Sequence, residues 1–291
     1  MTYRDRGLAL LVVLLLAGNI LAVKIGVSGI APLWAATLRF VIVAALVVPF
    51  TRITRAQLPK IGLFSVSFGT VHFGCMFAGM AKAEAGTVAL LVQLGTPIAA
   101  VLGVAVLKEP FRIKQAIGMA VSFAGVVMLA NGPSFPSTGT TVLLLASACG
   151  WATSALISKS GPTVNPLVLV GWSSLFCIPQ MLLLGMWLEP ITTTKIAHIS
   201  GGAIISIVYS ALFASMLGYT IWYFLLKKYP SSVVLPYSLL HPVLAVFLGI
   251  VFMGDSANPM KLCGGLFVIT GVAIGAIGTL TRLTRRVQRQ V

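Results

Sequence analysis

The chain alternates between long apolar runs and short connections that hold charged residues, glycine or proline. A helix needs about 20 apolar residues to cross a bilayer, and ten runs approach that length. The ten predicted spans are 7–25, 32–50, 61–81, 85–107, 113–130, 139–159, 166–188, 201–226, 231–253 and 260–281. Because the connections are short, this pattern predicts an all-α integral membrane protein built as a compact bundle.

The composition excludes a water-soluble fold. Of the 291 residues, 58% are apolar and only 9% are charged, whereas a soluble domain carries about 25% charged residues. The four cysteines lie in or beside apolar runs without a CxxC pattern; they are Cys75, Cys149, Cys177 and Cys263. We therefore expect buried thiols, with no disulfide, no metal site and no cofactor.

The positive charge predicts the topology. Lys plus Arg total 20 and Asp plus Glu total 5, an excess that would suggest nucleic-acid binding in a soluble protein. Here the cations lie between the apolar runs. An N-terminus inside the cell places 15 of them on the cytoplasmic side and 4 outside, with the last, Arg39, inside a span; this excess on the inside is what the positive-inside rule requires. We expect a multi-pass protein of the cell inner membrane, with both termini cytoplasmic and no nucleic-acid partner.

The two halves of the chain resemble each other. At an offset of 145 residues Pro97 falls on Pro242, and after a slip of one residue Glu109 falls on Asp255. We therefore predict two five-helix repeats, residues 1–138 and 139–291, the second with a short basic cytoplasmic tail. An odd number of spans makes the repeats insert in opposite directions. This inverted-repeat plan is typical of secondary transporters, with the substrate site near the midplane between the repeats.

These features resemble a known family. Glu109 follows the fourth span and Asp255 the ninth, Arg39 lies within Ala-Ala-Thr-Leu-Arg-Phe in the second span, and prolines interrupt the fourth and ninth spans. In this order they resemble the EamA family of the drug/metabolite transporter superfamily over residues 7–281. Within that family the chain is most similar to YddG-like amino-acid exporters. The resemblance implies export or exchange of small metabolites across the inner membrane.

The paired prolines are predicted hinge residues. Pro97 and Pro242 each remove a backbone donor and free the carbonyl four residues earlier, which belongs to Gln93 or Ser238. In lipid a freed carbonyl needs a partner or must line a cavity. We predict a paired kink at the midplane that offers acceptors to a substrate ammonium. The alternative is a tolerated kink whose carbonyl bonds to a neighbouring helix.

Three ionisable side chains lie inside predicted spans. His72 and His241 are candidate substrate contacts, because an intramembrane histidine can bind a carboxylate or carry a proton. A neutral imidazole that only joins two helices is the alternative. Arg39 lies about eight residues inside the second span and is a candidate anion contact. Snorkelling to the outer surface, or a structural contact to backbone carbonyls, is the alternative for this residue.

Aromatic residues with polar tips suit an amphipathic substrate. Their depth and the repeat place Trp151 and Tyr237 near the centre, so both are predicted to contact substrate. The EamA family often has Trp-Gly in its first helix, whereas here Ala17 precedes Gly18 and Asn19 follows it. The tryptophan of this motif is present only in the second repeat, as Trp151. Asn19 is therefore added to the predicted site. This departure leaves the substrate class open.

The last span contains a packing motif. Gly271 and Gly275 form a Gly-x-x-x-Gly pattern, the spacing at which small residues let two membrane helices pack closely. They predict that this span packs on the fifth span or on a second copy of the chain. The expected partners are a small-molecule substrate and the lipid bilayer. We expect a monomer, and a homodimer stays open.

The absence of other motifs narrows the function. No predicted span has a carboxylate near its centre, which argues against a proton antiporter for lipophilic cations, and there is no P-loop, HExxH or GxSxG. We predict a carrier, not an enzyme, that moves amino acids by alternating access. An exporter of drug-like or of phosphorylated and nucleotide-like metabolites is the alternative within transport. A channel-like or enzymatic membrane module is the alternative from another class.

Overall fold

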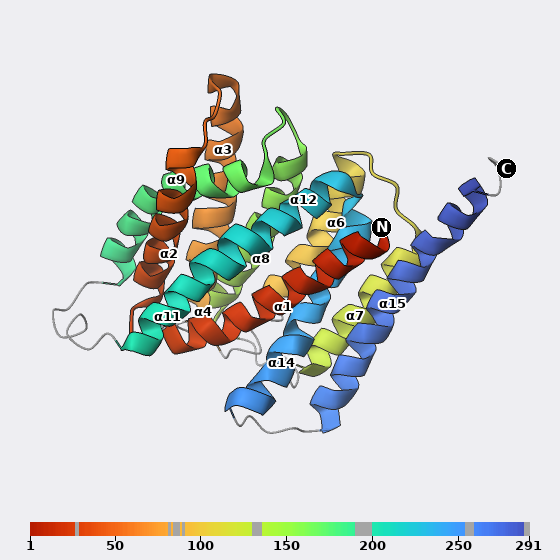
Figure 1. Cartoon of the computed structure of the whole chain (residues 1–291). Helices are drawn as coiled ribbons and strands as arrows, with labels where there is room; N and C mark the ends of the chain where they lie inside the picture. Colours follow the sequence, from red (N-terminus) through yellow and green to blue (C-terminus); the bar gives the residue numbers. More distant parts are fainter. Residues whose placement is uncertain are drawn as a thin grey trace.

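In the computed structural model all of the regular secondary structure is helical, with no strand among the residues that it describes (Figure 1). It describes residues 1–26, 29–80, 83, 88, 91–129, 136–189, 200–253 and 259–287, without the side chains at 24, 80, 253 and 275–287. The first half contains α1 (Tyr3–Gly26), α2 (Pro32–Val47), η1 (Val48–Phe50), η2 (Arg55–Gln57), α3 (Leu58–Phe64), η3 (Ser65–Gly74), α4 (Cys75–Met80), α6 (Gly95–Ala105) and α7 (Ile113–Leu129).

The second half repeats this order of long helices. It contains α8 (Thr138–Lys159), α9 (Pro166–Leu188), α11 (Gly201–Tyr209), η4 (Ser210–Tyr219), α12 (Thr220–Lys228), α13 (Ser231–Val234), η5 (Leu235–Leu239), α14 (Leu240–Met253) and α15 (Pro259–Val287). Local sequence explains where two of them begin. The Asn165 side chain accepts a hydrogen bond from the backbone N of Leu167, 2.9 Å away, and caps α9. The Ser200 hydroxyl caps α11 in the same way.

Among the described residues, seven helical stretches are long and apolar enough to cross a membrane. They are Tyr3–Val23, Pro32–Phe50, Arg55–Gly79, Thr138–Lys159, Pro166–Leu188, Gly201–Lys228 and Ser231–Phe252. Three shorter apolar helices, Leu91–Ala105, Ile113–Leu129 and Pro259–Ile274, fall in the fourth, fifth and tenth predicted spans. The all-α membrane fold is confirmed, and each predicted span carries an apolar helical segment. That all ten cross the bilayer stays a prediction.

The third and eighth spans contain widened turns at equivalent positions. Ser65–Gly74 and Ser210–Tyr219 are π-helical, and the two segments are offset by the 145 residues that align Pro97 with Pro242. A π-helical stretch is rare and frequently lies at a functional site. Its occurrence in both repeats makes these segments part of the repeated architecture.

A glycine seam joins α7 to α15. A Cβ atom added at Gly125 would lie 2.6 Å from the Gly264 carbonyl oxygen, and one added at Gly264 would lie 2.8 Å from the Gly125 carbonyl oxygen. Gly271 meets the backbone of Gly118 in the same interface. The last helix therefore packs on the fifth span, which is one of the two partners that its glycine motif predicts. The second glycine of the motif, Gly275, falls in the stretch 275–287, whose side chains are outside the described set.

Gly125→Ala is expected to destabilise the protein through this seam. The added methyl group would press on the backbone of α15, which cannot move aside as a flexible side chain can, so the two helices must separate. Overpacking of this kind typically costs about 1–3 kcal/mol. Thermal unfolding in detergent measures the effect. Gly62→Ala, where nothing lies within 4 Å of the added Cβ, is the control; an equal shift in both variants would contradict the seam.

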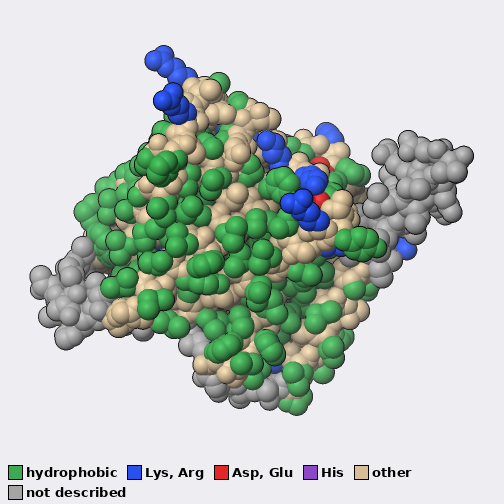
Figure 2. Space-filling model, in the orientation of Figure 1, with side chains coloured by type: hydrophobic (Ala, Val, Ile, Leu, Met, Phe, Trp, Pro, Cys, Tyr) green, Lys and Arg blue, Asp and Glu red, His purple; other side chains and the backbone are tan. Residues whose placement is uncertain are grey.

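The side of the bundle is apolar. Figure 2 shows hydrophobic side chains over most of the visible face, and Trp187 leaves 80% of its surface exposed. Such exposure is expected where lipid replaces water. Most of the blue Lys and Arg side chains gather along the upper edge in Figure 2. In the same view the connection from α2 to α3 lies at that edge (Figure 1). This is the edge that the charge pattern predicts to be cytoplasmic.

Candidate functional site

Aromatic rings fill the interior where η3, α8, η4 and α12 meet. Neighbouring ring centroids in this group lie 4.7 to 6.3 Å apart. We call these seven buried residues the ring cluster: Phe68, His72, Phe73, Trp151, Tyr219, Trp222 and Tyr223. The first three come from the first repeat and the other four from the second repeat. The ring cluster is therefore formed between the two repeats.

His72 and Trp151, both predicted site residues, lie within the ring cluster. Their ring centroids are 5.4 Å apart. The Nδ1 atom of His72 donates to the Ser147 carbonyl oxygen at 3.1 Å, and the Ser147 hydroxyl donates to the His72 carbonyl oxygen at 2.9 Å. Because a carbonyl only accepts, this contact places the proton on Nδ1. The histidine thus joins η3 to α8, as its alternative interpretation expects, and also faces the rings.

Arg39 lies at one edge of the ring cluster. Its side chain is 3% exposed, so it does not snorkel to the surface. The Nε atom donates to the Ser215 hydroxyl at 2.5 Å, and the guanidinium carbon lies 4.5 Å from the ring centroid of Phe73. The contact is thus to a side-chain hydroxyl of η4, in the other repeat, whereas the structural alternative drawn from the sequence named backbone carbonyls.

His241 lies at the opposite edge of the ring cluster, beside Trp222. Their ring centroids are 6.4 Å apart. Four buried side-chain atoms have no hydrogen-bond partner in the described part of the chain: Arg39 Nη2, Thr220 Oγ1, Trp222 Nε1 and His241 Nε2. An unsatisfied buried polar atom typically costs about 1–3 kcal/mol, so such atoms call for a ligand or water. Trp222 belongs to the ring cluster, Arg39 and His241 lie at its edges, and Thr220 follows Tyr219 in the chain.

Residues just before the two prolines meet at equivalent positions of the two repeats. The Gln93 Nε2 atom donates to the Ser238 carbonyl oxygen at 2.8 Å, which is the carbonyl that Pro242 frees. The Ser238 hydroxyl lies 2.8 Å from the Thr96 hydroxyl. Because Gln93 and Ser238 are 145 residues apart, they meet where the symmetry axis of the repeats passes. In this conformation the carbonyl that Pro242 frees is hydrogen-bonded to a side chain of the first repeat. Pro97 lies in the first turn of α6.

Two predicted residues lie apart from the ring cluster. The Asn19 side-chain oxygen accepts from the Ser210 hydroxyl at the start of η4. Tyr237 is buried in η5, and it forms no ring-to-ring contact within the described residues. The structure thus gathers His72 and Trp151, places Arg39 and His241 at the edges, and holds the kink residues in a separate contact. Whether any of them binds substrate stays a prediction.

Sequence reasoning did not select most of the ring cluster. Aromatic side chains on membrane helices also face lipid, so residue type alone does not distinguish the two positions. One signal was available: Tyr219, Trp222 and Tyr223 are spaced i, i+3, i+4, which puts them on one face of a helix. Phe68 and Phe73 carry no comparable signal, because the π-helical turn between them changes the usual periodicity.

A largely buried ion pair lies at the edge of the bundle that is predicted to be cytoplasmic. Glu109, after α6, pairs with Lys159 at the end of α8, and their side chains are only 12% and 10% exposed. Lys159 Nζ also donates to the Tyr229 carbonyl oxygen at 2.8 Å, and the backbone N of Ser231 donates to Glu109 at 2.6 Å. These four residues, which we call the latch, join the ends of α6, α8 and α12 to the start of α13 across the repeat boundary.

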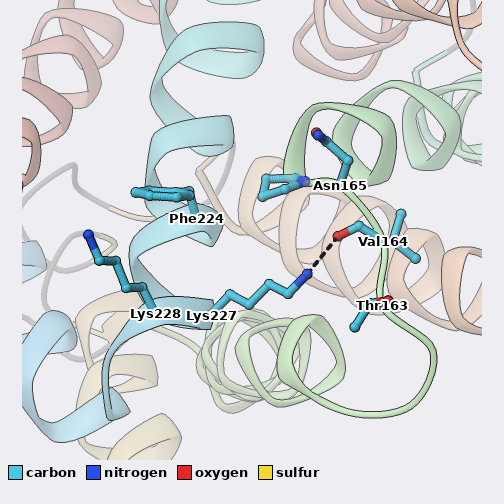
Figure 3. A pocket seen from close by; sticks show the side chains of 7 residues that line it. Thr163, Val164, Asn165, Phe224, Lys227 and Lys228 are labelled. Carbon is cyan, nitrogen blue, oxygen red and sulfur yellow. Dashed lines mark hydrogen bonds between the residues drawn. The ribbon is translucent and has the colours of Figure 1, made fainter.

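A surface cavity of about 440 Å³ lies beside the end of α12 (Figure 3). Its lining residues are Thr163, Val164, Asn165, Pro166, Phe224, Lys227 and Lys228. Figure 3 shows Lys227 extending toward Val164, whose carbonyl oxygen accepts from its Nζ at 3.5 Å, whereas Lys228 extends the other way. None of the predicted site residues lines this cavity. The candidate site is therefore the ring cluster with its edges.

Comparisons with known proteins agree with this architecture. The profile of the EamA-like transporter family matches residues 7–131 and 138–276. A Salmonella typhimurium protein named "Probable amino-acid metabolite efflux pump" is 32% identical over 99% of both chains. An Escherichia coli protein of the same name is 28% identical over 96% of both chains. A crystal structure with 17% identity covers 99% of both chains with a TM-score of 0.76, and so has the same fold.

Proposed function

We propose that this chain, which belongs to the EamA-like transporter family, exports or exchanges amino acids across the inner membrane by alternating access. It is a multi-pass membrane protein of a transporter family, and we propose that it works as a carrier and not as an enzyme. The amino-acid substrate, the inner-membrane location with cytoplasmic termini and the mechanism are the parts that we propose. Two relatives that match nearly the whole chain carry the name "Probable amino-acid metabolite efflux pump", which supports this substrate class.

The observation that carries the proposal is the ring cluster between the repeats. A zwitterion needs ring faces or acceptors for its ammonium and donors for its carboxylate. The ring faces of Trp151 and Tyr219 meet the first need. Trp222 Nε1 is a buried donor without a partner in the described part of the chain, and Arg39 Nη2 is another. A site with both kinds of group suits an amino acid better than an anion or a lipophilic cation.

The latch supports alternating access. It fastens α6 to α8 and α13 at one end of the bundle, and we propose that a path from that end to the ring cluster opens when the ion pair breaks. The Gln93–Ser238 contact and the two π-helical segments lie at equivalent positions of the repeats. A rearrangement in one repeat therefore has a counterpart in the other, as inverted-repeat carriers require.

Uptake into liposomes tests the proposal. The purified protein is reconstituted, and uptake of each labelled L-amino acid is followed with and without a pH gradient. We expect saturable uptake that an internal unlabelled amino acid accelerates, since counterflow is specific to carriers. Uptake without saturation would indicate a channel instead. Protein-free liposomes are the control, and folded protein that moves none of the amino acids would overturn the proposal in favour of phosphorylated or drug-like solutes.

A further inference from the structure

Arg39 is a positive charge inside a helix that is predicted to span the membrane, and no described residue beside it carries an opposite charge. Its side chain is 97% buried, because only 3% of its surface is exposed. Of the carboxylates in the described part of the chain, Asp5 and Glu109 form ion pairs with lysines. Glu189 accepts a hydrogen bond from a backbone N at the start of α2. None of these three pairs with Arg39, so its charge has no protein counter-ion there.

The surroundings of Arg39 hold the guanidinium without neutralising it. Phe73 and Tyr219 have their ring centroids 4.5 and 5.7 Å from the guanidinium carbon, and ring faces attract a cation. The Ser215 hydroxyl accepts from Nε at 2.5 Å. Rings and hydroxyl groups carry no net charge, so a buried cation with these partners still attracts an anion from outside the protein.

The unused donor fits a carboxylate. A guanidinium presents five donors in a planar fork that matches the two oxygens of a carboxylate. Nε and Nη2 share one edge of that fork. Ser215 occupies the Nε half, and Nη2 has no partner in the described residues. A carboxylate at this edge would accept from both nitrogens and take the place of the Ser215 hydroxyl.

The charge occurs in only one of the repeats. Pro32 and Pro166 begin α2 and α9, and this alignment places Ser173 at the position of Arg39. Ser173 is buried and donates to a carbonyl oxygen of its own helix. A substrate carboxylate therefore has one guanidinium to bind, and the orientation of a zwitterion between the repeats is set by it.

We propose that Arg39 binds the α-carboxylate of the transported amino acid and displaces the Ser215 hydroxyl from its Nε edge. This inference rests on the amino-acid transport proposed above and names the contact that recognises the substrate class. Because Arg39 lies on α2 and Ser215 on η4, carboxylate binding breaks a contact between the repeats. Substrate occupancy thereby changes the interaction of the same helices that must move during transport.

Competition by an amino acid and by its amide tests this contact. The probe is the labelled L-amino acid with the largest saturable uptake in the liposome panel. Its competitors are the unlabelled acid and the corresponding amide, which keeps the side chain and ammonium but has no carboxylate. We expect the amide to compete at least tenfold more weakly against wild-type protein. In Arg39→Gln, competition by the acid should weaken at least tenfold, while competition by the amide should stay unchanged. The ratio of the two inhibition constants should therefore approach one.

Other variants separate recognition from a structural role. If Arg39 has only a structural role, Arg39→Gln should lower transport but keep the wild-type ratio of acid to amide competition, and that result would overturn the inference. Equal competition by the acid and the amide in the wild type would overturn it as well. If Arg39→Gln does not fold, Arg39→Lys carries the test; its single-point charge should reduce the ratio without abolishing it, and an unchanged ratio overturns the inference. Ser215→Ala should keep the preference, and Arg52→Gln, at an exposed position, is the control. A wild type that transports no amino acid fails the proposed function instead.

Discussion

Lys159→Gln is expected to lower transport at least tenfold and to open the end of the bundle that is predicted to be cytoplasmic. The substitution leaves the Glu109 carboxylate buried without its ion-pair partner. Removal of one partner of a buried pair typically costs about 3–5 kcal/mol, and about 1.4 kcal/mol is already a factor of ten in an equilibrium. The state in which the latch is closed should therefore lose most of its population.

Thiol labelling measures the opening directly. Ser232 is 3% exposed, and its hydroxyl donates to the Pro110 carbonyl oxygen beside the latch at 3.1 Å. A Ser232→Cys variant should react slowly with a membrane-impermeant maleimide and should react much faster after Lys159→Gln. Lys114→Gln is the matched control, because Lys114 is exposed at the edge that is predicted to be cytoplasmic and forms no ion pair within the described residues.

The paired charge reversal distinguishes the ion pair from packing. Glu109→Lys combined with Lys159→Glu keeps opposite charges at the two positions, so it should recover part of the transport that Lys159→Gln loses. Unchanged maleimide reactivity at position 232, together with normal transport by Lys159→Gln, would show that the latch does not control access from this side.

Trp151→Ala is expected to abolish transport and to lower the stability of the protein. The indole packs against four members of the ring cluster, at centroid distances of 5.4 Å to His72, 6.0 Å to Trp222, 6.2 Å to Tyr219 and 6.3 Å to Phe68. Truncation of a buried tryptophan typically costs about 3–5 kcal/mol. The void would lie where the two repeats meet, so both packing and substrate contact are lost together.

A second substitution separates those two effects. Trp151→Phe keeps a ring face and should unfold close to the wild-type temperature, while its KM for the preferred amino acid rises. Trp187→Ala removes the same side chain from an 80% exposed position and should change neither quantity greatly. Native transport kinetics in Trp151→Ala would remove the ring cluster as the substrate site.

The sequence was sufficient for the helices and for some of their contacts. Apolar length predicted each helical segment, and the alignment of Pro97 with Pro242 identified equivalent positions of the two repeats. The glycine spacing around Gly271 limited the partner of the last span to two choices. These properties depend on residues close together in the chain, or on the repeat, so they can be recognised without knowing which helices touch.

The remaining features depend on contacts between distant residues. The latch joins Glu109 to Lys159, and a lysine at a helix end is equally well explained by topology. The meeting of Gln93 with Ser238 follows from the symmetry axis, which becomes visible only when the repeats are placed in space. The widened turns of η3 and η4 need the packing of neighbouring helices, since the local sequence is also compatible with a regular α-helix.

The lone charge of Arg39 has a consequence for energetics at the cellular level. A zwitterionic amino acid carries no net charge across the membrane, yet any displacement of α2 along the membrane normal moves the guanidinium through the electric field. A full elementary charge moved across 100 mV corresponds to about 2.3 kcal/mol, so a tenth of that path corresponds to about 0.2 kcal/mol. The membrane potential therefore biases this conformational step, whichever amino acid is transported.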